Sequence, residues 1–79
     1  MKITFYQFIF EQNQRQDPIG GLSRNIIKDI YAPTWSNSFN RWHKHLIKNN
    51  ANKENLSALF EVWGDYQAML ALNIIKTNI

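Results

Sequence analysis

A chain of 79 residues has room for one domain. Its three Trp, three Tyr and five Phe can form a hydrophobic core that needs no disulfide or metal ion to stabilise it. The lack of cysteine excludes disulfides, thiolate metal sites and a Cys nucleophile, and it suits a reducing cytoplasm. The net charge of +3 is uneven: residues 35–53 carry four basic side chains and no acid, whereas residues 54–79 carry three acids and one base. We therefore expect a cytoplasmic single domain over residues 1–79, with its core at about 4–75.

The first predicted helix covers about residues 4–13. Thr4 and Gln7 have the spacing of a capping box, in which each side chain satisfies a backbone N–H of the first turn. Apolar side chains then recur at helical intervals, at Phe5, Phe8 and Ile9. The polar run 13–16 ends this pattern.

The second predicted helix, about 18–30, has the clearest start. Asp17 can accept the free N–H groups of the first turn, and Pro18 suits the first helical position. One face is marked by Ile19, Leu22, Ile26 and Ile30. Because glycine weakens a helix, Gly20 and Gly21 indicate a helix crossing closely there. Without a preceding strand, this pair does not predict a nucleotide-binding loop.

The third predicted helix follows a break at Pro33 and is capped by Ser36 or Ser38. The spacing predicts a buried stripe of Trp35, Phe39, Trp42 and Leu46. The opposite face carries Arg41, Lys44 and Lys48.

The fourth predicted helix is the longest, about 53–75, with Asn52 as its cap after the turn 49–52. Gly64 indicates a second close contact. Its expected apolar stripe consists of Leu56, Leu59, Phe60, Trp63, Gln67, Leu70 and Ile74. No alternating pattern of a strand is present, so the fold class is all-α: a compact bundle of four or five short helices.

Several of these segments resemble the YozE SAM-like family over about residues 4–70. They are Phe5-Tyr6-Gln7-Phe8, the run Gln14-Arg15-Gln16-Asp17-Pro18-Ile19-Gly20, and single residues at Leu22, Asp29, Pro33, Trp63 and Tyr66. The most specific piece is Asp17-Pro18-Ile19-Gly20 after an aromatic first helix.

The resemblance implies a compact helical bundle similar to a sterile alpha motif domain. Members of the family are small, mostly uncharacterised bacterial or phage-borne proteins, so the resemblance implies a fold and no activity. The chain departs from the family pattern at three positions: Gly21 replaces an acidic residue, Ser23 an Ala and Phe8 a Trp.

The residues that carry chemistry give no sign of an enzyme. His43 and His45 point about 200° apart on a helix and cannot share one metal ion, so we expect no metal and no cofactor. Glu61 and Asp65 are one helical turn apart, but paired carboxylates need a cleft to act as acid and base. We expect no catalytic residues and no small-molecule substrate. The apolar run 68–72 is too short to span a membrane, which needs roughly 20 residues.

The basic set Arg41, Lys44, Lys48 and Lys53 is the candidate binding site. Two functions fit it. The first is protein–protein interaction, including head-to-tail self-association in which the basic face meets Glu54, Glu61 and Asp65 of a second copy. The second is DNA binding, because two helices joined by a turn resemble a helix-turn-helix. Tyr6 and Tyr31 lie off the buried stripes and are further candidate contacts.

Overall fold

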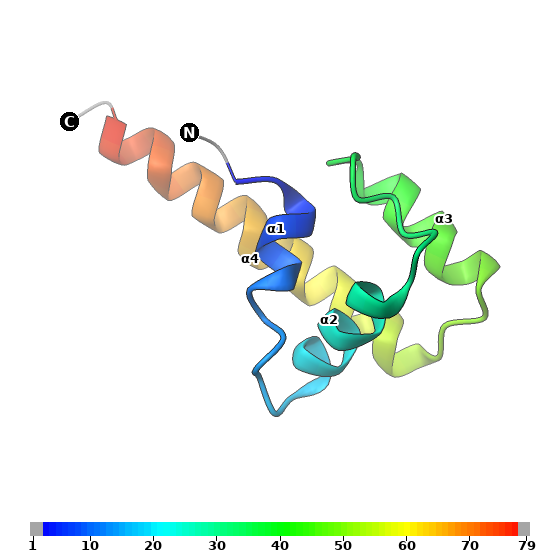
Figure 1. The fold of residues 1–79 in the computed structure, drawn as a ribbon. Coiled ribbons are helices and arrows are strands. Elements are labelled where there is room, and N and C mark those ends of the chain that lie inside the picture. Colours follow the sequence, from blue (N-terminus) through cyan, green and yellow to red (C-terminus); the bar gives the residue numbers. More distant parts are fainter. Residues whose placement is uncertain (1–2, 78–79) are drawn as a thin grey trace.

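The computed structural model describes residues 3–77, with side chains described as far as residue 72. All regular structure in this range is helical: α1 (Phe5–Phe10), α2 (Pro18–Lys28), α3 (Phe39–Lys48) and α4 (Lys53–Thr77). The other three helices all pack against α4, and α1 also packs against α2 (Figure 1). The C-terminal half of α4 extends beyond the other helices (Figure 1). The predicted all-α class is confirmed.

The helix α1 begins as predicted and ends early. Thr4 accepts a hydrogen bond from the Gln7 N–H, and the Gln7 side chain accepts one from the Thr4 N–H, which completes the capping box. The helix ends at Phe10 instead of about residue 13. The Asn13 side chain donates to the Phe10 carbonyl at 2.6 Å, and such local bonds compete with the helical pattern.

The start of α2 is fixed by Asp17 and by the loop before it. Asp17 accepts the Gly20 N–H at 3.1 Å, which confirms the predicted cap, and forms an ion pair with Arg15 at 2.6 Å. A Cβ on Gly20 would lie 2.0 Å from the Arg15 carbonyl oxygen. The close approach at Gly20 therefore comes from this loop and not from a crossing helix.

Two other glycine predictions are wrong, because Cβ atoms at Gly21 and Gly64 would meet no neighbour within 4 Å. The expected end of the second helix is also wrong. Asp29 ends α2 in an extended conformation, so Ile30 lies in the connection and is 85% exposed.

The core is built around the ring of Phe5, which is fully buried. Ring centroids of Trp42, Trp63 and Tyr66 lie 5.5, 4.9 and 5.3 Å from it, with edge-on contacts to both indoles. Polar bonds hold the same end of α1. The Phe5 N–H donates to Asn37 Oδ1, and the Tyr66 hydroxyl donates to the Ile3 carbonyl.

The predicted buried stripe of the third helix is correct at Trp42 and Leu46 and wrong at Trp35. Trp35 is 72% exposed because Ser38, not Ser36, caps α3, so Trp35 lies in the connection that precedes the helix. Phe39 is half-buried.

The buried stripe of α4 is rotated from the predicted one. Phe60 and Gln67 are exposed, and Leu56, Trp63 and Leu70 are only half-buried. The fully buried positions are Ala58, Leu59, Val62 and Tyr66. The prediction followed a spacing of three to four residues that began at Leu56, whereas the buried face is centred on Leu59, Val62 and Tyr66. Ile74 lies outside the residues whose side chains are described.

We expect the two tryptophans of the α3 region to contribute very differently to stability. Trp42→Ala should lower the free energy of unfolding by about 3–5 kcal/mol, because it empties the core beside Phe5. Trp35→Ala serves as the matched control and should cost less than about 1 kcal/mol. Urea unfolding followed by circular dichroism measures both, and similar losses would contradict this arrangement.

Candidate interaction surface

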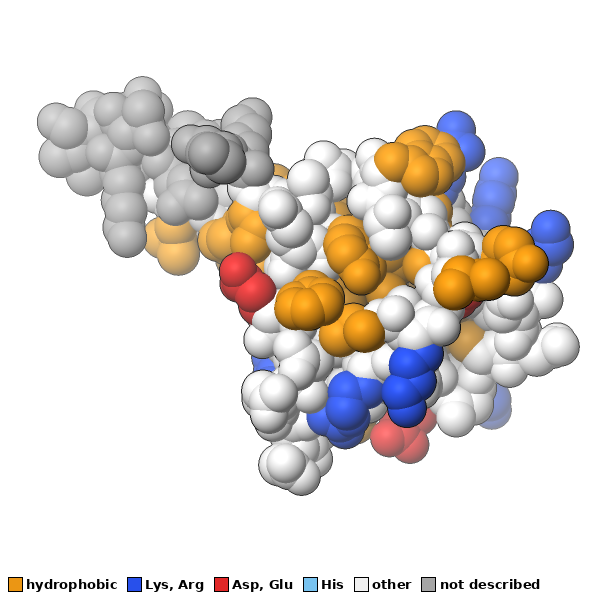
Figure 2. All heavy atoms as spheres, viewed as in Figure 1, with side chains coloured by type: hydrophobic (Ala, Val, Ile, Leu, Met, Phe, Trp, Pro, Cys, Tyr) orange, Lys and Arg blue, Asp and Glu red, His pale blue; other side chains and the backbone are white. Residues whose placement is uncertain are grey.

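Arg41, Lys44 and Lys48 are all exposed and form one strip along α3, which we call the basic strip. The spacing i, i+3, i+7 places them on one face, opposite Trp42 and Leu46. Figure 2 shows Lys and Arg side chains along the right-hand edge of the molecule, over α3, beside exposed hydrophobic side chains. The structure thus places these three predicted residues together.

Trp35 adds an aromatic ring to the basic strip. The Arg41 guanidinium carbon lies 4.7 Å from the centroid of the Trp35 ring, a distance at which the cation is attracted to the ring face. The pair therefore presents an indole and a guanidinium together at the surface. Sequence reasoning missed this contact because it assigned Trp35 to the core.

A buried hydrogen bond and a helix cap hold the connection between α2 and α3, residues 29–38, in place. The Trp42 indole N–H donates to the Ser36 carbonyl at 2.8 Å, and both groups are buried. Ser38 caps α3 by accepting the Arg41 N–H. This anchoring fixes the segment that presents Tyr31, 80% exposed, and Trp35.

A hydrogen bond between Asp29 and His45 connects the C-terminal end of α2 to α3. The His45 Nε2 and Asp29 Oδ2 atoms are 2.6 Å apart, and Asp29 Oδ1 accepts the Tyr31 N–H at 2.9 Å. The hydrogen bond with His45 lowers the pKa of the Asp29 carboxyl below its usual range. The Asn49 amide nitrogen lies 3.4 Å from His45 Nδ1, so both ring nitrogens face a polar partner. A residue pair sixteen positions apart leaves no local sequence signal.

The remaining predicted contact residues lie apart from the basic strip or at its end. Lys53 is exposed and begins α4, after the Asn52 cap, whose side chain accepts the Asn55 N–H at 2.8 Å. Tyr6 is half-buried and stacks on Trp42, so it is not a free contact. His43 packs on Phe39. In the described part of the chain, no group of three His, Cys, Asp or Glu side chains could hold a metal ion.

The acidic residues of α4 are exposed at positions Glu54, Glu61 and Asp65. The pKa of Arg15 is raised, first by its hydrogen bond to Asp17 and further by the charges of Asp65 and Glu61. The spacing of the three acids puts them on one face of α4, and we call this second charged surface the acidic strip. Its Glu61 and Asp65 lie near Arg15, just before α2.

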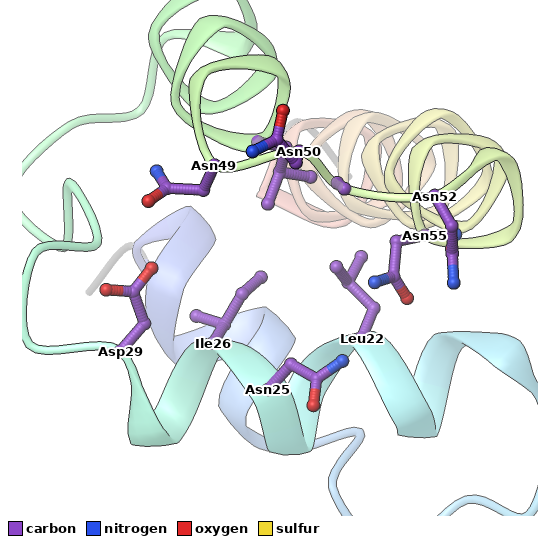
Figure 3. A pocket seen from close by; sticks show the side chains of 10 residues that line it. Leu22, Asn25, Ile26, Asp29, Asn49, Asn50, Asn52 and Asn55 are labelled. Atoms are coloured by element: carbon purple, nitrogen blue, oxygen red, sulfur yellow. The ribbon is translucent and has the colours of Figure 1, made fainter.

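A pocket of about 290 Å³ lies between α2 and the turn that joins α3 to α4 (Figure 3). Leu22 and Ile26 of α2 and Leu46 of α3 form its apolar part. Its polar lining is Asn25, Asp29, Asn49, Asn50, Asn52 and Asn55. From the sequence, residues 49–52 are predicted only to form a turn.

A family model described as the YozE SAM-like fold matches residues 4–68, most of the chain. This protein belongs to the YozE SAM-like family. No curated protein and no solved structure matches it. Within the residues that the structure describes, no helix has the length and apolarity to cross a membrane.

The structure explains one departure of this YozE SAM-like chain from the residues that the resemblance led us to expect. Ser23, in place of Ala, is fully buried, and its hydroxyl donates to the Ile9 carbonyl at 2.6 Å. That bond joins α2 to α1 without leaving a buried polar group unpaired.

We expect Asp29→Asn to reduce stability in a pH-dependent way. A carboxyl with a lowered folded-state pKa stabilises the fold above the ordinary aspartate range, and this contribution is lost as the pH falls through the folded-state pKa. The variant should be less stable than the native chain by roughly 1 kcal/mol at pH 6. The difference should shrink below about pH 4. Thermal unfolding from pH 2.5 to 7 measures it, and a pH-independent difference would refute this role.

Proposed function

We propose that this chain is a non-enzymatic binding module that engages an acidic protein surface through the basic strip. The observation that carries the proposal is the exposed Trp35 ring held against Arg41 beside Lys44 and Lys48. Trp and Arg are among the three residue types most enriched at the positions that dominate protein–protein binding energies. A cytoplasmic setting is consistent with the cysteine-free sequence.

The geometry of the connection supports a rigid binding surface. Ordering long side chains on association costs binding free energy, and a surface that is already held in place avoids part of that cost. Here the Ser36–Trp42 bond and the Ser38 cap hold the backbone on both sides of Asn37, next to Trp35. Charge complementarity then favours a partner with an acidic face.

A second copy of this chain carries such a face. The acidic strip runs along α4. Its residues Glu61 and Asp65 have the same i, i+4 spacing as Lys44 and Lys48 of the basic strip. The two strips lie on different helices, so each copy of the chain carries both. The basic strip of one copy would contact the acidic strip of the next, which gives a head-to-tail arrangement. The second copy is therefore the first partner to test.

DNA binding through α3 is the alternative, and the connection argues against it. In a helix-turn-helix the two helices are joined by three or four residues, whereas α2 and α3 are separated by residues 29–38. Phe39, at the start of α3, packs on Phe60 and Trp63 instead of facing a groove. The exposed face of α3 carries only three basic side chains, and Lys53 lies beyond the following turn.

We expect the native chain to self-associate at low salt in sedimentation experiments, and the charge-reversed variant R41E/K44E to remain monomeric. E61K/D65K should also remain monomeric. An equimolar mixture of the two variants should form a dimer, because one supplies an intact acidic strip and the other an intact basic strip. K28E, which reverses an exposed base of α2, is the control and should behave like the native chain.

Two results would count against the proposal. Self-association that survives R41E/K44E would move the contact elsewhere on the surface. Binding to a short duplex DNA that is lost in R41E/K44E, with a log–log salt slope near −0.9 per phosphate contact, would favour the alternative.

A further inference from the structure

The connection between α2 and α3 exposes large apolar side chains to water. Ile30, Tyr31 and Trp35 are 85%, 80% and 72% exposed, and no other large hydrophobic side chain in the described part of the chain exceeds 57%. Single apolar side chains on a protein surface are ordinary. These three fall within six consecutive residues, so their Cα atoms lie within about 18 Å of one another.

The first of two turns exposes Ile30 and Tyr31. The Ala32 N–H donates to the Asp29 carbonyl at 3.2 Å, and this bond closes a four-residue turn with Ile30 and Tyr31 at its centre. Asp29 Oδ1 also accepts the Tyr31 N–H. Gly, Pro, Asn, Asp and Ser dominate such central positions because of what the turn backbone requires. An Ile-Tyr pair meets no such requirement, so the turn itself does not explain these side chains.

The second turn exposes Trp35 in the same way. The Ser36 N–H donates to the Pro33 carbonyl at 3.0 Å, which places Trp35 at the third position of a turn. Pro33 and Ser36 are buried, and the Ser36 carbonyl accepts the indole N–H of Trp42. The three exposed side chains therefore project from a backbone that is anchored to the core.

The charge around this connection is almost entirely positive. Residues 18–53 carry six basic side chains and a single acid, Asp29, whose carboxylate is already hydrogen-bonded. Lys28 is exposed and ends α2 just before the first turn, and Arg41 lies against Trp35 after the second. Figure 2 shows exposed hydrophobic side chains beside Lys and Arg at this edge of the molecule.

This combination matches the surface of an anionic lipid bilayer. Tyr and Trp rings have an apolar body and a polar tip and collect at the boundary between lipid and water. Lys and Arg are attracted to anionic headgroups. A single nucleic-acid strand would stack on the two rings but would leave Ile30 in water. A folded protein would need a separate hollow for each projecting side chain, whereas lipids rearrange around it.

We propose that the α2–α3 connection binds an anionic phospholipid surface. Ile30 and Tyr31 enter the boundary layer, Trp35 lies at headgroup depth, and Lys28 and Arg41 contact the lipid phosphates on either side. This goes beyond the proposed function and does not depend on it, because Ile30, Tyr31 and Lys28 are not part of the basic strip.

The test is co-sedimentation of the full chain with vesicles of equal parts phosphatidylcholine and phosphatidylserine. Pure phosphatidylcholine vesicles are the reference and should bind far less. Ile30→Ser and Tyr31→Ser should each weaken binding roughly tenfold, as expected for an apolar side chain kept in water. Lys28→Ala should weaken it roughly fivefold. Leu72→Ser, which removes an apolar side chain of α4 that is 57% exposed, is the matched control and should bind like the native chain.

Insertion is measured separately by quenching of tryptophan fluorescence with brominated acyl chains. Trp35 should be quenched in the mixed vesicles. Trp35→Phe should keep most of the binding and lose most of the quenching, because Trp42 is buried in the core and Trp63 is half-buried.

Three results would overturn the proposal. The first is no binding to the mixed vesicles. The second is binding that Ile30→Ser and Tyr31→Ser leave unchanged, which would reduce it to adsorption through the basic strip. The third is a loss of self-association, or of binding to single-stranded DNA, in Ile30→Ser while vesicle binding persists. Vesicle binding needs no second copy, so a chain that stays monomeric contradicts the proposed function alone.

Discussion

The burial of Phe5 is the constraint on which the rest of the structure depends. Its helix, α1, has only six residues, far fewer than a helix needs to be stable alone in water. The ring compensates for this short length because it contacts Trp42 on α3 and Trp63 and Tyr66 on α4 at once. Removing that contact would loosen the packing of α3 on α4, the two helices that carry the charged surfaces, and leave them joined mainly through Phe39.

The position of the basic strip follows from the same core contact. Trp42 is held by Phe5 on one side and by the Ser36 carbonyl through its indole N–H. With Trp42 inside, helical geometry turns Arg41, Lys44 and Lys48 outward. The Ser36 bond also fixes the connection in which Trp35 lies, so the pairing of Trp35 with Arg41 is a consequence of core packing.

The sequence was sufficient for features that depend on neighbouring residues. The caps at Thr4, Asp17 and Asn52 are local hydrogen bonds, and all three are formed. Trp35 and Trp42 could not be told apart in this way, because both are apolar and the choice depends on which serine caps α3. The basic strip was predicted because it lies on one helix.

Contacts between distant segments had no local signal. The Asp29–His45 pair is one example, since it joins the end of α2 to α3 across sixteen positions. The pocket is similar, since its asparagines come from three separate segments that only the fold brings together. Residue type alone did not distinguish these asparagines from ordinary turn and cap residues.

Hydrogen exchange in the variant Phe5→Leu tests the central role of Phe5 most directly. Phe8→Leu is the control, because Phe8 is half-buried and its ring packs on that of Tyr66. In Phe5→Leu the indole N–H of Trp42 and the backbone amides of α3 should exchange faster than in the native chain, together with those of α1. Faster exchange confined to α1, with α3 as protected as in the control, would show that α3 docks independently of Phe5 and would contradict the account.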